Sequence, residues 1–169
     1  MEIFIAIRTF FEAGGNVLYL IAAATFCMWA LIFERLWFIR TEHKEDVREA
    51  VTYWKKRGEI SSWNAQMMRQ RIISEVSLRL TQNMSFIKTL ISLLPLLGLL
   101  GTVTGMVQVF EAMTYSGGNA RSMAAGVSAA TIPTMSGMVA TLSGVLANTF
   151  LSSKVAKQES LVEDSLAME

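Results

Sequence analysis

The sequence predicts an all-α membrane protein with three transmembrane helices. Three stretches, residues 13–33, 89–110 and 122–153, contain no charged side chain. Each is long enough to cross a bilayer as a helix, which takes about 20 apolar residues. The chain has 169 residues, of which 52% are hydrophobic and only two are proline. Because the polar remainder is too dispersed for a large separate domain, we expect one membrane domain with a helical cytoplasmic extension.

The basic residues predict the orientation of the three helices in the membrane. Residues 35–88 carry eleven of the fifteen Lys and Arg residues, and Lys154 and Lys157 follow the last uncharged stretch. Only Arg8 and Arg121 lie on the opposite side. Since Lys and Arg are retained on the cytoplasmic side, we expect the N-terminus outside and the C-terminus inside.

The first uncharged stretch ends in a charged and aromatic border at residues 34–38, which suits the headgroup level. Its apolar run is too long for a cleaved signal peptide and lacks a convincing cleavage site, so we expect a spanning helix. The predicted division is a periplasmic segment at 1–12, transmembrane helices at 13–38, 89–113 and 122–153, a helical cytoplasmic segment at 39–88, a periplasmic connector at 114–121 and a cytoplasmic tail at 154–169.

A stripe of apolar residues leads from the cytoplasmic segment into the second crossing. Its members recur at steps of three and four, which indicates one helix face. We expect one long helix from about Asn64 to Met113 that projects far into the cytoplasm. The stripe is expected to pack on a first cytoplasmic helix, predicted at residues 42–58, and on neighbouring subunits. Its members are Ile73, Val76, Leu80, Met84, Ile87, Ile91 and Leu94.

The reactive residue types argue against an enzyme. Cys27 is the only cysteine and lies mid-span, and His43 is the only histidine and has no companion cysteine. Neither a Ser/His/Asp set nor a Cys/His set can be assembled from them. The sequence also lacks a phosphate-binding loop and a nucleic-acid motif. We therefore expect no catalytic residue, no metal, no cofactor and no nucleic-acid partner.

Small and hydroxyl residues mark the second and third crossings. Thr134, Thr141 and Asn148 recur every seven residues, so they share one side of a helix. Because such groups are unsatisfied against lipid, they should face other helices, a partner or a hydrated lumen, although a purely structural seam remains an alternative. A further polar stripe lies on the second crossing and consists of Thr104, Gln108 and Glu111. Glycines expected to allow close helix packing are Gly98, Gly101, Gly105, Gly137 and Gly144.

Two further features concern a possible pathway through the membrane. Pro133 has no N–H, so it leaves the Ala129 carbonyl without its helical partner and predicts a kink. A proton relay usually includes an ionisable group at depth, yet none lies in the three uncharged stretches. If this chain conducts protons, a partner helix must supply the acid.

The run LPLLGLLGTVTG at residues 94–105 resembles the second membrane helix of the ExbB/TolQ/MotA proton-channel family. Residues 118–121, 123–126 and 134–144 are similar to the entry and core of that family's third helix. Glu34 and Arg35 after the first span also fit. The resemblance covers roughly residues 14–40 and 86–152.

This resemblance implies a homo-oligomeric bundle, specifically a homopentamer around a dimer of a single-span ExbD-like partner with a membrane aspartate. In the bacterial inner membrane, that complex would act on a TonB-like protein to drive outer-membrane nutrient uptake. The family's pore threonines map onto Thr102 and Thr134. A glutamate of many relatives falls at Ala129, where Ser128 and the freed carbonyl are the nearby polar groups, and a second family proline falls at Ser143.

Three other functions stay open at this point. A TolQ-like motor for envelope maintenance and a flagellar stator belong to the same family, although the short cytoplasmic region argues against the stator. A non-conducting membrane scaffold, in which the small residues serve only packing, is the alternative from a different class.

Overall fold

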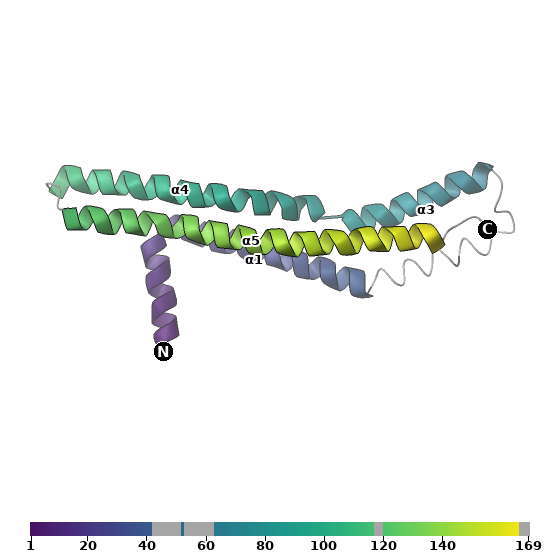
Figure 1. The fold of residues 1–169 in the computed structure, drawn as a ribbon, viewed down its shortest axis with the longest axis horizontal. Helices are drawn as coiled ribbons and strands as arrows, with labels where there is room; N and C mark the ends of the chain where they lie inside the picture. Colours follow the sequence, from purple (N-terminus) through teal and green to yellow (C-terminus); the bar gives the residue numbers. More distant parts are fainter. Residues whose placement is uncertain (42–51, 53–62, 117–119, 166–169) are drawn as a thin grey trace. The chain divides into compact units, whose positions relative to one another are not determined.

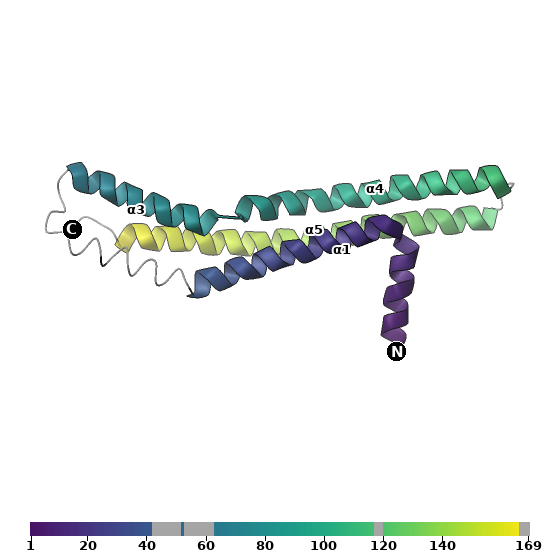
Figure 2. The same cartoon turned by 180° about the vertical axis from the view of Figure 1, so that it is seen from behind.

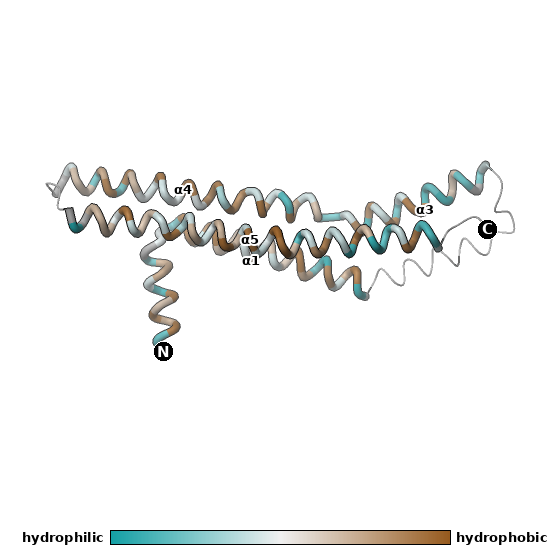
Figure 3. The backbone as a smooth tube through the Cα atoms, in the orientation of Figure 1, coloured by the Kyte–Doolittle hydropathy of each residue, from teal (hydrophilic) through white to brown (hydrophobic). Residues whose placement is uncertain are grey.

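The computed structural model describes residues 1–41, 52, 63–116 and 120–165, and these residues are organised as helices (Figure 1). The long helices are α1 (Glu2–Thr41), α3 (Trp63–Thr81), α4 (Met84–Ser116) and α5 (Ala120–Ser165). Three segments are long and apolar enough to cross a membrane: Gly14–Thr41, Gln66–Thr114 and Met123–Ser165. Hydrophobic residues dominate α4, whereas hydrophilic ones gather at the end of α5 (Figure 3). The predicted all-helical class with three apolar spans is confirmed.

The chain forms two compact units. The first contains Met1–Trp29 and Lys88–Leu146, and the second contains Ala30–Ile87 and Ala147–Glu169. In the first unit, α4 and α5 run side by side in opposite directions, with α1 against them (Figures 1 and 2). Its buried apolar side chains include Val17, Leu18, Ile21, Met28, Ile91, Leu94, Val109 and Ala130.

The second unit contains most of the predicted apolar stripe. Val76, Leu80, Met84 and Ile87 are buried there, together with apolar residues of α1 and α5. Two polar contacts join α3 to α5: Ser77 Oγ donates to Glu159 Oε1, and Arg69 Nη2 donates to the Glu163 carbonyl at 3.1 Å. His43 lies outside the described residues, and so does the helix predicted at residues 42–58 apart from residue 52. In the part that the structure describes, the stripe packs within this chain. The buried apolar residues that α1 and α5 contribute to this unit are Ile32, Ile39, Leu151, Val155 and Val162.

Arg35 is buried in the second unit, with 3% of its surface exposed. Its Nη1 donates to the Arg79 carbonyl at 3.1 Å, and its guanidinium lies 5.2 Å from the centre of the Phe38 ring. The Arg79 carbonyl belongs to the last turn of α3, where helix carbonyls lack intrahelical donors. A cation at that end is also favoured by the helix dipole. Arg35 therefore ties α1 to the C-terminal end of α3.

The single long helix expected from Asn64 to Met113 is wrong. The chain turns at Gln82 and Asn83 between α3 and α4, and Asn83 has a positive φ of 62°. The Asn83 carbonyl then accepts from Ile87 N at 3.1 Å, which is the first helical bond of α4. Asparagine is one of the few non-glycine residues that adopt this conformation at low cost. The apolar stripe continues on both sides of the turn, so its period gave no sign of the break.

Candidate functional site

The backbones of α4 and α5 approach each other closely in the first unit. A Cβ built on Gly98 would lie 3.0 Å from Thr134 Cα, and one built on Gly137 would lie 2.7 Å from the Leu94 carbonyl oxygen. Gly101 faces Pro133 and Gly105 faces Ala130. These pairs place α4 and α5 antiparallel at a separation that only glycine permits. Gly144 differs, because its nearest neighbours are side-chain atoms of Met28 and Ile91.

Thr134 lies at the centre of this contact. Its Oγ1 donates to the Gly98 carbonyl at 2.8 Å, which links α5 to α4. Thr102 directly follows Gly101, whose neighbour is Pro133, so Thr102 and Thr134 lie at the same level of the helix pair. Thr102 Oγ1 donates to the Leu99 carbonyl of its own helix at 2.7 Å. A hydroxyl that donates keeps two lone pairs for accepting, so each threonine still offers an acceptor.

The two threonines lie on the side of the α4–α5 pair that faces away from α1. On the opposite side, which faces α1, Thr104 of α4 and Ala129 of α5 line a cavity together with α1 residues. Positions two residues apart on a helix differ by about 200° and positions five apart by about 140°. Thr102 therefore points away from Thr104, and Thr134 away from Ala129. The structure brings Thr102 and Thr134 to one face but places Ala129 on another.

Two other predicted site residues of α5, Thr141 and Ser128, also lie on different faces of the helix. Thr141 Oγ1 donates to the Gly137 carbonyl at 2.7 Å, and the half-buried Thr141 continues the line of Thr134. Ser128 is exposed, and its carbonyl accepts from Thr131 Oγ1 at 2.7 Å. Six residues correspond to about 240° of rotation, so Ser128 does not share the face of Thr134. The chain remains helical through Pro133, whose missing N–H leaves the Ala129 carbonyl without that bond.

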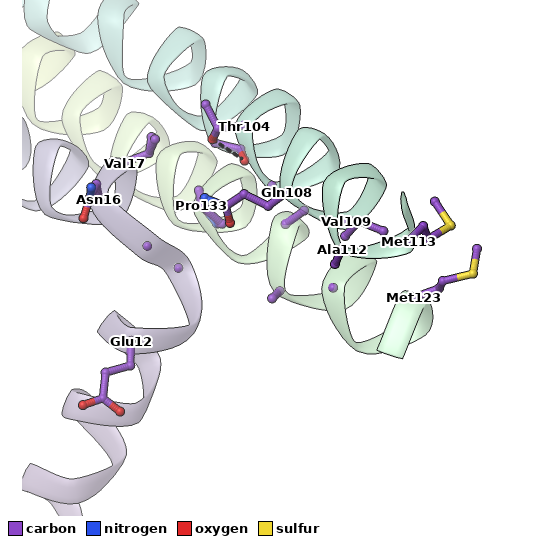
Figure 4. Close-up of a pocket in the computed structure, with 17 residues that line it drawn as sticks. Glu12, Asn16, Val17, Thr104, Gln108, Val109, Ala112, Met113, Met123 and Pro133 are labelled. Atoms are coloured by element: carbon purple, nitrogen blue, oxygen red, sulfur yellow. Dashed lines mark hydrogen bonds between the residues drawn. The ribbon is translucent and has the colours of Figure 1, made fainter. Parts of the chain in front are cut away.

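The cavity between α1, α4 and α5 has a volume of about 470 Å³ (Figure 4). Its polar lining includes Asn16, Thr104 and Gln108, with Glu12 at its border. Thr104 Oγ1 donates to the Leu100 and Gly101 carbonyls at 3.0 and 3.1 Å. The stripe of Thr104 and Gln108 was visible in the sequence. Asn16 was missed, and the signal that could have found it is a lone amide inside an otherwise apolar run.

Asn148 provides a test of the polar line on α5. Its Oδ1 is buried and accepts no hydrogen bond from any residue that the structure describes. Burying an unsatisfied acceptor costs about 1–3 kcal/mol, so leucine, which has a similar size, removes a penalty. We expect Asn148→Leu to keep or raise the thermal unfolding temperature of the purified protein. Thr141→Val, which deletes a hydroxyl that is already bonded, serves as the control. A clear drop in the unfolding temperature of Asn148→Leu alone would show that the amide has a partner in the assembled protein.

Comparison with known proteins agrees with these features. The model of the MotA/TolQ/ExbB proton channel family matches residues 38–164, and this chain belongs to that family. It is a multi-pass membrane protein and a non-enzymatic channel subunit.

The chain is also similar to an individual ExbB-like protein. Over 84 residues the chain is 36% identical to the biopolymer transport protein ExbB-like 1 of Synechocystis sp.. The overlap covers 47% of this chain and a third, 33%, of the relative's length. The chain is thus ExbB-like at low identity.

Proposed function

We propose that this chain is the channel subunit of an ExbB-like motor driven by the proton-motive force in the bacterial inner membrane. Five copies, with the N-terminus outside and the C-terminus inside, surround a dimer of an ExbD-like single-span protein. The complex energises a TonB-like protein for nutrient uptake across the outer membrane. The name of the ExbB-like relative favours this role over a TolQ-like motor.

The observation that carries the proposal is a polar face without a titratable group. Thr102 and Thr134 lie level with each other on the side of α4–α5 that faces away from α1. The three uncharged stretches contain no Asp, Glu, Lys, Arg or His. Threonine hydroxyls can hydrogen-bond to a proton carrier, but they do not ionise near neutral pH. The partner aspartate therefore supplies the titrating group, and Thr102, Thr134, Thr141 and Asn148 form the wall around it.

Two free-energy differences of similar size would act in this cycle. Protonation of a mid-membrane carboxylate removes a penalty of roughly 2.5–3.5 kcal/mol on insertion scales. Each proton that crosses a potential of about 100 mV releases about 2.3 kcal/mol. Alternate protonation of the two aspartates can therefore shift the partner dimer within the ring.

Copurification and proton flux test the proposal together. The tagged chain, expressed in its own cells, should copurify with a one-span protein that carries a membrane aspartate and with a TonB-like protein. Vesicles that contain the chain and the partner should acidify under an imposed potential, and vesicles with the chain alone should not. A chain that isolates without either partner, or a complex that carries no flux, would favour the non-conducting scaffold. Copurification of Tol proteins instead would favour the TolQ-like role.

A further inference from the structure

The cavity between α1, α4 and α5 extends deep into the membrane-spanning part of the first unit. Its lining includes Met113 near the end of α4 and Gly101 in the middle of the uncharged stretch 89–110. These two residues are twelve positions apart, which corresponds to about 18 Å along a helix axis. A hydrocarbon layer is about 30 Å thick. The cavity therefore reaches from the end of a span to roughly the middle of the membrane.

Two interruptions of regular helix border this cavity. Gly15 of α1 has φ 65° and ψ −166°, and a Cβ built on it would meet no other atom within 4 Å. Pro133 of α5 lacks the N–H that would bond the Ala129 carbonyl, and both residues line the cavity. Because a helix carbonyl points along the axis toward the residue four positions later, the freed carbonyl lies at the cavity wall. Irregular backbone at membrane depth is tolerated where protein buries it or where it lines a water-filled space.

Polar side chains of two helices add to the freed carbonyl. Asn16 of α1 and Gln108 of α4 line the cavity, and neither amide hydrogen-bonds to any residue in the part of the chain that the structure describes. The Gln108 side chain extends toward Pro133 (Figure 4). Each amide offers two N–H donors and one acceptor, and the Thr104 hydroxyl keeps lone pairs besides the bonds it donates. The cavity wall thus presents both donors and acceptors that are open to an occupant.

The size and chemistry of the cavity select its occupant. Its volume of about 470 Å³ far exceeds the roughly 10–15 Å³ that a single water molecule needs. A lipid acyl chain would leave the two amides and the freed carbonyl without partners, and burying such groups unpaired is unfavourable. Polar cavities of this size hold water, whereas empty cavities are apolar. Small side chains keep the space open, because much of the lining is glycine and alanine: Gly14, Gly15, Gly101, Gly105, Gly126, Ala112, Ala129 and Ala130.

We propose that this cavity is a water-filled inlet, which carries water within a single protomer to the middle of the membrane. Gly101 and Pro133 line the inlet, and they directly precede Thr102 and Thr134 in the sequence. The glycine-packed contact of α4 with α5 therefore separates two polar compartments at one level, the inlet on the α1 side and the threonine face on the other. The proposal goes beyond the channel function and holds whether or not the complex conducts protons.

Cysteine labelling tests the inlet, because methanethiosulfonates react with the thiolate, which forms only where water reaches the thiol. The full-length protein with Cys27→Ala carries Thr104→Cys or Gln108→Cys in the inlet. The matched controls are Val103→Cys and Val107→Cys, which lie about 100° round the helix, outside the cavity lining, and are 54% and 52% exposed. In phosphatidylethanolamine–phosphatidylglycerol nanodiscs, 2-aminoethyl methanethiosulfonate reaches both membrane faces. We expect mass spectrometry to show labelling at 104 and 108 at least tenfold faster than at 103 and 107.

A second substitution ties the labelling to this cavity. Ala129→Leu enlarges a lining residue, so it should slow the labelling of Thr104→Cys at least threefold and leave that of Val103→Cys unchanged. Elution of each variant at the size of the unmodified protein controls for assembly. Equally slow labelling at 104 and 103 would show a cavity filled by lipid or protein and would overturn the proposal. Labelling of Thr104→Cys that Ala129→Leu does not slow would mean that water arrives by another route, which also contradicts it.

Discussion

Alanine at Gly137 is expected to disrupt the α4–α5 contact, whereas alanine at Gly144 is tolerated. A Cβ on Gly137 would lie 2.7 Å from the Leu94 carbonyl oxygen and 3.3 Å from Gly98 Cα, and both of these atoms belong to the backbone. Backbone atoms cannot move aside without separating the helices, which would also lengthen the Thr134–Gly98 hydrogen bond. Overpacking of this kind costs roughly 1–3 kcal/mol. At about 2–4 °C per kcal/mol for a chain of this size, the unfolding temperature should fall by roughly 2–12 °C.

Gly144→Ala is the matched control for this prediction. Its Cβ would meet Met28 Sδ at 2.5 Å, Met28 Cε at 3.0 Å and Ile91 Cγ1 at 3.0 Å. The thioether side chain of methionine is flexible and can adopt another rotamer. Thermal unfolding of the two purified variants, followed by tryptophan fluorescence, compares them on the same helix. Equal loss of stability in both variants would show that the close approach of the α4 backbone is not the reason why residue 137 must be glycine.

The three spans could be predicted from the sequence, but the helix faces that contact each other could not. Three uncharged stretches indicated three helices, because a charge at depth is costly and its absence is easy to recognise. The glycine pattern likewise indicated close packing. It could not tell that Gly126 faces Val109 of α4 while Gly144 faces Met28 of α1 as well as Ile91. Such pairings depend on which helices are neighbours, and periodicity within one helix carries no information on that.

Two helix interruptions each arise from the backbone conformation of a single residue. Asn83 and Gly15 both have positive φ values, of 62° and 65°, and each interrupts a helix that the hydrophobic pattern continues. Because apolar residues follow Asn83 at helical spacing, the pattern alone favoured one straight helix there. The position of Ala129 illustrates the same limit for the site. Its carbonyl is released by Pro133, but the rotation of five residues along α5 separates Ala129 from Thr134.

Thr134→Val is expected to leave the protein folded and to reduce proton flux through the reconstituted complex by at least tenfold. Valine preserves the shape of threonine but removes the hydroxyl that donates to Gly98 at 2.8 Å. Interhelical hydrogen bonds in membranes contribute about 0.6 kcal/mol on average, so assembly should survive. In the proposed channel the same hydroxyl oxygen accepts from water or from the protonated aspartate. Loss of that acceptor raises the barrier, and a tenfold effect corresponds to about 1.4 kcal/mol.

Ser136→Ala and Thr134→Ser separate this effect from a general loss of packing. Ser136 lies two residues further along α5, about 200° round the helix from Thr134, and its hydroxyl donates to the Ile132 carbonyl of its own helix at 2.9 Å. Its replacement by alanine should leave the flux unchanged, because residue 136 lies on the side of α5 that faces α1 and not on the face that Thr134 shares with Thr102. Thr134→Ser restores a hydroxyl at the same Cβ and should recover most of the flux. If Thr134→Val assembles normally and conducts as well as the unmodified protein, the hydroxyl serves only the α4–α5 contact and the pathway runs along another face.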